Sequence, residues 1–119
     1  MREERFDGWR NYETATVNLW LENDAGSYAY WQERTAWHWR EVSNGFRGDE
    51  YTTDSELKET AACALAEELK DEISDRLPLT EPSLYSDLLN AAIGEIDWYE
   101  IAANWLESVM ESENPRNEE

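Results

Sequence analysis

The segment from Thr53 to Ile73 constrains the fold of this chain more tightly than any other. Thr53 and Glu56 have the T-x-x-E spacing of a capping box, in which each side chain accepts a hydrogen bond from the backbone of the other residue at a helix start. The apolar residues that follow recur every four positions, which is typical of one face of a helix. They are Leu57, Ala61, Leu65, Leu69 and Ile73. We therefore predict a long amphipathic helix that ends near Leu77 and Pro78.

Four other segments carry the start and stop signals of helices. Their candidate N-terminal caps are Asn11, Ser27, Ser83 and Asp97. These residue types accept hydrogen bonds from the backbone N–H groups of the first turn, which have no partner inside the helix. Gly26, Gly45 and Gly94 stand where three of the helices should end. We therefore expect further helices over residues 11–23, 27–42, 83–94 and 97–110.

The same spacing predicts which side chains form the core. In the first helix we expect Val17, Trp20 and Leu21 to be buried. The inward face of the second helix comprises Tyr28, Trp31, Thr35, His38 or Trp39, and Val42. The inward face of the last helix comprises Trp98, Ile101, Ala102, Trp105, Leu106 and Val109. The single cysteine, Cys63, lies in an alanine-rich run and is expected to be a buried structural thiol.

A chain of 119 residues has the size of one domain. We predict an all-α fold, with a single compact domain of about five helices over residues 1–110 and a disordered acidic tail over residues 111–119. A short hairpin near residues 44–53 stays open as an alternative, because two glycines lie there. The sequence has no apolar run of roughly 18 residues that would span a membrane, and its N-terminus lacks the apolar stretch of a signal peptide. We therefore expect a cytoplasmic protein.

Acidic residues dominate the second half of the chain. The formal net charge is −18, and residues 1–47 hold 8 acidic and 6 basic side chains, whereas residues 48–119 hold 20 and 4. A field of this sign repels nucleic acids and anionic membrane surfaces, and it attracts cationic partners. Direct binding to nucleic acid or to a membrane is therefore disfavoured, and a basic protein is the expected partner.

The residue types that carry most enzyme chemistry are scarce. Nucleophilic catalysis by Ser or Cys generally needs a His base nearby, and His38, between Trp37 and Trp39, is the single histidine. A structural hydrogen-bonding role is the favoured interpretation for it. The sequence also lacks the ligand spacing of zinc sites and the glycine loops that bind phosphates. We predict no catalytic residue, no metal and no cofactor, and carboxylate-dependent hydrolysis stays as a less favoured alternative.

The predicted helix from Thr53 has the charge density of a polyanion. Between Asp54 and Asp75 there are 8 acidic residues. Over about 33 Å of helix this is roughly one carboxylate per 4 Å, against one phosphate per about 3.4 Å along a DNA strand. Four of these residues have the spacing of one helical face, which we expect to lie opposite the face of Leu65 and Leu69. The four are Glu68, Asp71, Glu72 and Asp75.

Two interpretations of these acidic residues stay open: a solvated face that confers solubility, or a surface that occupies a basic groove. The second gains support because acidic residues continue through the last two predicted helices. The predicted partner-binding residues are Glu67, Glu68, Asp71, Glu72, Asp75, Glu100, Glu107 and Glu111.

The tryptophans of the N-terminal half also allow two interpretations. These are Trp9, Trp20, Trp31, Trp37 and Trp39. The favoured one places most of them in the core. In the other they form an exposed platform with nearby arginines, because Trp and Arg are common interface anchors. The protein would then be a non-catalytic interaction module that binds a partner through its Trp-rich N-terminal half.

Two motifs, GWRNYET with LWLEND and, later, DWYEIAANW, resemble those of a family of small, uncharacterised acidic proteins from phages, plasmids and other mobile elements. Ala15 departs from the family, which often has an aromatic residue there. The resemblance implies that this is a mobile-element protein. A small, highly acidic protein of that origin is similar in type to the anti-CRISPR or antirestriction inhibitors that imitate nucleic acid. The matching residues are Gly8, Trp9, Asn11 to Thr14, Leu19 to Leu21, Asn23, Asp24, Asp97, Trp98, Glu100 to Ala102 and Trp105.

The leading hypothesis combines the acidic surface with this setting. We expect an inhibitor of a host defence machine that presents DNA-mimicking carboxylates to the basic groove of a nucleic-acid-binding protein, such as a CRISPR effector subunit or a restriction enzyme. Association driven by opposite charges should be fast and sensitive to salt.

Overall fold

The computed structural model describes residues 6–45, 52–78 and 81–113. Within these ranges the chain forms five helices: α1 (Tyr12–Asn23), α2 (Ala25–Gly45), α3 (Asp54–Asp75), α4 (Leu84–Gly94) and α5 (Trp98–Glu113). The same ranges contain no strand, only an isolated antiparallel bridge between Phe6 and Trp9. The predicted all-α class is therefore confirmed.

Two expectations fall partly outside the described residues. Of the possible hairpin near residues 44–53, residues 46–51 lie outside them, and so do residues 114–119 of the predicted tail. Helix α5 continues to Glu113, three residues into the segment that was predicted to be a tail. None of the helices in the described part of the chain is long and apolar enough to cross a membrane.

Most helices begin at the caps that the sequence predicts. The Thr53 hydroxyl accepts from the Glu56 backbone N–H at 3.2 Å, and the Glu56 carboxylate accepts from the Thr53 N–H at 3.0 Å, which completes the capping box. Ser83 and Ser86 form a second capping box at the start of α4, and the Asn11 side chain caps α1 by accepting from the Thr14 backbone N–H. The Asp97 carboxylate accepts from the third residue beyond it at 3.0 Å and caps α5.

The start of α2 corrects a prediction, because Ser27 lies inside the helix and Asp24 caps it. The Asp24 carboxylate accepts from the backbone N–H groups of Gly26 at 2.9 Å and Ser27 at 3.2 Å. Its own N–H donates to the Trp20 carbonyl at 3.3 Å, so the same residue ends α1. Gly26 therefore does not separate the two helices, since a carboxylate that reaches two free N–H groups caps α2 before the glycine.

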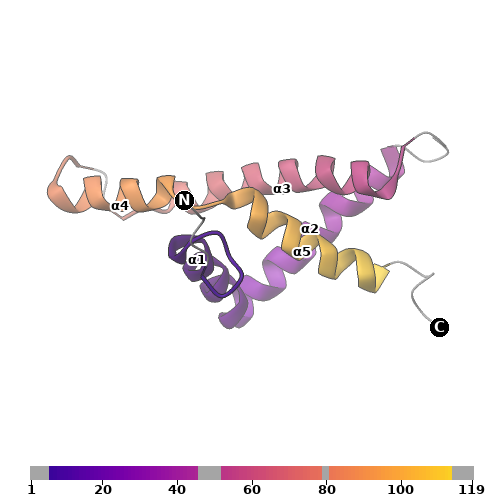
Figure 1. Cartoon of the computed structure of the whole chain (residues 1–119), viewed down its shortest axis with the longest axis horizontal. Coiled ribbons are helices and arrows are strands. Elements are labelled where there is room, and N and C mark those ends of the chain that lie inside the picture. The colour runs from indigo at the N-terminus through magenta and orange to yellow at the C-terminus, as the bar shows by residue number, and fades with distance from the viewer. Residues whose placement is uncertain (1–5, 46–51, 79–80, 114–119) are drawn as a thin grey trace, which may run out of the picture.

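Helices α2, α3 and α5 pack against one another and form the core (Figure 1). All six predicted inward residues of α5 are buried, as are Leu65 and Leu69 of α3 and Trp31 of α2. Helix α1 packs mainly on α2. Helix α4 continues in the direction of α3 at one end of the molecule, which measures 52 × 34 × 27 Å, and packs against the other helices less than they pack among themselves (Figure 1).

Three side chains predicted to lie inward are exposed: Trp20, Cys63 and Tyr28, of which Tyr28 is 43% exposed. Trp20 lies on the outward face of α1 with 70% of its surface accessible. Cys63 is exposed on α3 because it is two residues from both Ala61 and Leu65, and a step of two residues turns a helix by about 200°. A short alanine-rich run therefore does not by itself place its cysteine inside.

Candidate acidic interface on helix α3

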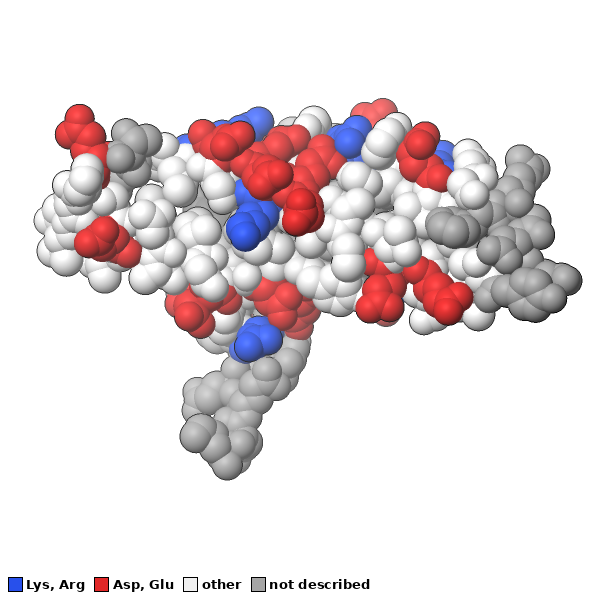
Figure 2. Space-filling model, turned by 90° about the horizontal axis from the view of Figure 1, so that it is seen from above, with Lys and Arg blue, Asp and Glu red and all other residues white. Residues whose placement is uncertain are grey.

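The outward side of α3 carries a row of exposed carboxylates. Figure 2 looks onto this side of the molecule, where acidic side chains gather with few basic ones among them. Lys70 is an exposed basic residue of the same helix. We call five of the exposed acidic residues of this helix the α3 acidic face. It consists of Glu56, Glu59, Glu67, Asp71 and Asp75.

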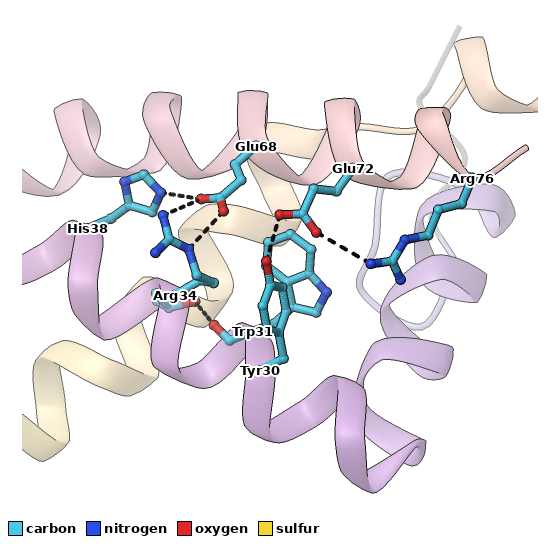
Figure 3. A network of polar contacts seen from close by, with 8 residues as sticks. Tyr30, Trp31, Arg34, His38, Glu68, Glu72 and Arg76 are labelled. Carbon is cyan, nitrogen blue, oxygen red and sulfur yellow. Dashed lines mark hydrogen bonds and ion pairs between the residues drawn. The ribbon is translucent and has the colours of Figure 1, made fainter.

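The four-residue row predicted from the sequence is divided between two sides of the helix. Asp71 and Asp75 are exposed, but Glu68 and Glu72 are half-buried and point from α3 toward α2 (Figure 3). Glu68 follows Leu65 by three residues, a step that leaves the two side chains only about 60° apart. The expectation that the whole row lies opposite the apolar face is therefore wrong, because half of the row borders it.

Glu68 is held by two donors from α2. The Arg34 guanidinium donates to both carboxylate oxygens, from Nε at 2.7 Å and from Nη2 at 3.1 Å, and His38 Nε2 lies 2.6 Å from Oε1 (Figure 3). The ionised carboxylate can only accept, so Nε2 carries the hydrogen of the His38 contact. The exposed fraction of the Glu68 side chain is only 20%. These bonds make Glu68 an internal link between helices and not a free surface charge.

Ionisation of this group follows from its surroundings. Burial alone raises the pKa of Glu68, but the hydrogen bonds and charges of Arg34 and His38 outweigh burial and hold it below its usual value. The same hydrogen bond raises the pKa of Arg34. Glu68 is therefore a carboxylate at neutral pH, and its charge is already compensated within the fold.

Glu72 makes the second link between the two helices. The Tyr30 hydroxyl donates to its carboxylate at 2.7 Å, and Arg76 lies 3.8 Å away on the same helix (Figure 3). The hydrogen bond to Glu72 is the main reason that the pKa of Tyr30 is raised. Sequence reasoning missed Tyr30 and Arg34. A signal was present, because Tyr30, Arg34 and His38 recur every four residues along α2, as Glu68 and Glu72 do along α3.

The predicted acidic residues of α5 are also dispersed. The Glu107 carboxylate forms an ion pair with Lys58 of α3 at 2.8 Å. Glu100 is half-buried and accepts from the Arg10 backbone N–H at 2.9 Å. Glu111 is exposed near the end of the helix. The structure therefore brings Glu67, Asp71 and Asp75 together on one outward face, and it divides the other five predicted residues between internal contacts and α5.

His38 lies in a structural position with 9% of its surface exposed, between its Glu68 contact and the edge of Trp37, whose ring centre is 5.0 Å away. The Arg34 guanidinium carbon lies over the Trp37 ring, 4.6 Å from the ring centre. Among the described residues, no three His, Cys, Asp or Glu side chains are arranged to hold a metal ion.

The tryptophans of the N-terminal half divide between core and surface. Trp31 is buried, and Trp9 and Trp39 are partly buried against the core. Trp37 is 42% exposed and Trp20 is 70% exposed. The core interpretation therefore holds for three of them, and the two exposed rings lie on different helices.

Comparison of the chain with protein-family models, with curated proteins and with solved structures finds no match.

Proposed function

We propose that this protein is a non-catalytic inhibitor that occupies the nucleic-acid-binding groove of a basic host protein with its α3 acidic face. The observation that carries the proposal is the exposed row of Glu67, Asp71 and Asp75 at intervals of four residues on one ordered helix. Successive carboxylates in this row are separated by a rise of about 6 Å, which is of the same order as the spacing of phosphates along a strand.

Rigidity supports the proposal. The Glu68 and Glu72 links hold α3 against α2, and Ala61, Ala62 and Leu65 bury its opposite side in the core. A preorganised row of charges loses little conformational entropy when it binds. Mutual repulsion of like charges at this spacing costs some tenths of a kcal/mol per pair, which a basic partner would relieve.

The proposed partner is a nucleic-acid-binding defence protein, such as a CRISPR effector subunit or a restriction enzyme. The resemblance of the two terminal motifs to mobile-element proteins motivates this choice. The net charge of −18 agrees with it, because opposite charges would accelerate encounter with a basic groove.

A matched pair of charge reversals tests the surface. Glu67→Lys with Asp71→Lys changes the α3 acidic face, whereas Glu33→Lys with Glu41→Lys makes the same change in net charge at exposed positions of α2. Each protein would be used to capture partners from a host lysate at low and at high salt, and captured proteins would be assayed for displacement from DNA or RNA.

We expect the wild type and the α2 variant to capture a nucleic-acid-binding protein and to displace its nucleic acid at low salt. The α3 variant should lose both activities. Equal displacement by the α3 variant would overturn the proposed surface, and capture that survives high salt would overturn its electrostatic basis.

A second candidate function is favoured by the exposure of Trp20 beside Tyr12 and Leu19, which are 62% and 55% exposed. In this candidate the N-terminal half is a protein-interaction module and the acidic residues confer solubility. Aromatic anchors act through desolvation, so binding would survive high salt.

A further inference from the structure

Helix α1 departs from the pattern of an ordinary surface helix on both of its sides. Its inward side buries Thr14 and Asn18 beside Leu21, whereas Tyr12, Leu19 and Trp20 face outward. A buried polar side chain and an exposed apolar patch are the two departures from the usual pattern that carry information.

Specific hydrogen bonds fix this orientation. The Trp105 indole N–H donates to Asn18 at 2.7 Å, and the Asp97 backbone N–H donates to Thr14 at 2.9 Å. Rotating α1 to bury its apolar side would leave both donors without these acceptors, and a buried unsatisfied donor costs about 1–3 kcal/mol. The fold therefore holds the apolar side outward.

A tight turn closes one end of this side. Phe6 and Trp9 exchange two backbone hydrogen bonds, of 2.7 and 2.8 Å, around Asp7 and Gly8, whose φ angles are +51° and +87°. Positive φ at both central residues is the signature of the type I′ turn, for which Asp-Gly is a preferred pair. The turn sets the Phe6 ring edge-on against Tyr12, with ring centres 5.0 Å apart.

Between the turn and the outward side of α1 lies a groove of about 360 Å³. Aromatic and aliphatic side chains line most of it, including Phe6, Tyr12, Leu19 and Trp20. The charged residues that line it are Asp7 and Glu22, so the described lining carries carboxylates and no Lys or Arg.

We propose that this groove binds a cationic segment of a partner protein, in which an Arg or Lys stands next to an apolar side chain. The carboxylates at the lining would pair with the cation, the aromatic rings would offer it their faces, and Leu19 would pack against the apolar neighbour. A second copy of this chain is a poor occupant, because two chains of net charge −18 repel each other. The inference rests on the second candidate function and names the chemistry of its partner.

The probe for a test is a fluorescein-labelled peptide of alternating Leu and Arg, compared with the same peptide carrying Glu in place of Arg. Binding would be measured by fluorescence anisotropy, and the shift of the Trp20 indole N–H resonance would locate it. Helix α4 offers a matched control, because Leu84 and Tyr85 form an adjacent pair that is 67% and 69% exposed.

We expect Leu19→Ala with Trp20→Ala to weaken binding of the Arg peptide about tenfold or more, and Leu84→Ala with Tyr85→Ala to leave it unchanged. Glu22→Lys provides a second variant that keeps the apolar lining and should also weaken binding. All of these side chains are exposed, and circular dichroism would verify that each variant is folded.

Equal binding by the two double variants, or equal binding of the Glu peptide, would overturn the groove as the site. The charge reversals of Glu67 and Asp71 separate this inference from the leading function, because they should leave binding of the Arg peptide in the groove unchanged. The result of the nucleic-acid displacement assay for the α3 acidic face does not depend on the result of this peptide-binding test.

Discussion

Helices α3 and α1 expose opposite kinds of side chain. The outward side of α3 is acidic and its inward side is apolar, as periodicity predicts, whereas α1 buries Thr14 and Asn18 and exposes Leu19 and Trp20. An apolar stripe therefore points inward when the neighbouring helices offer it an apolar surface. On α1 they offer hydrogen-bond donors instead, and these select the polar side.

The largest expected effect is a difference in stability between alanine substitutions of an inward leucine on α3 and an outward leucine on α1. Leu65→Ala removes a side chain that is 1% exposed and should lower the free energy of unfolding by about 2–5 kcal/mol. Leu19→Ala should change it by no more than about 0.5 kcal/mol. Urea denaturation followed by circular dichroism measures both, and comparable losses would contradict the assignment of faces.

The second-largest effect on stability should come from replacing Asn18, the buried polar side chain of α1. Asn18→Leu leaves the buried Trp105 indole N–H without its acceptor and should cost about 1–3 kcal/mol of unfolding free energy. Asn104→Leu, at an exposed position of α5, makes the same chemical change and should cost less than about 0.5 kcal/mol. Thermal and urea denaturation of the two variants measure the difference. A stabilising Asn18→Leu would show that polar pairing does not orient α1.

Two adjacent glutamates sharpen the contrast between the faces of α3. Glu68→Gln weakens charged hydrogen bonds and should lower the free energy of unfolding at neutral pH by about 1–2 kcal/mol. Glu67→Gln, on the exposed side, should change it by less than about 0.5 kcal/mol.

The pH dependence of the Glu68 effect has a definite sign. Its folded-state pKa lies below the value of about 4.3 expected for an unfolded chain. The stabilisation is therefore complete above that pH and is lost as the pH falls through the folded-state pKa. Urea denaturation between neutral and strongly acidic pH should show the wild type and Glu68→Gln converging. A gap that persists at the acidic end would contradict this origin.

The smallest effect tests repulsion within the α3 acidic face. Asp71→Lys places a cation four residues from both Glu67 and Asp75 and should raise the free energy of unfolding by about 0.5 kcal/mol at low salt. High salt should reduce the gain. Differential scanning calorimetry at two salt concentrations measures it, and a loss of stability would indicate that these carboxylates do not repel one another.

The sequence predicts only part of the candidate site, because helical spacing relates side chains within one helix and not between helices. Helical spacing places Asp71 and Asp75 on one face but groups them with Glu68 and Glu72 and not with Glu67. The inward direction of Glu68 depends on Arg34 and His38 in another helix. Spacing gives the angle between two side chains on one helix, but it does not reveal which side of the helix lies against a hydrogen-bond donor of another helix. The fold class followed more readily, because caps and apolar periodicity are local signals.

The helices, most of their caps and the inward stripe of α5 can be predicted from local sequence, because each depends on residues only a few positions apart. Long-range packing sets which side of α1 is buried and which carboxylates of α3 remain exposed. The contacts responsible join residues far apart in the chain, such as Asn18 and Trp105, which are separated by 87 positions. A polar side chain becomes an inward one only when the fold brings its partner within hydrogen-bonding distance.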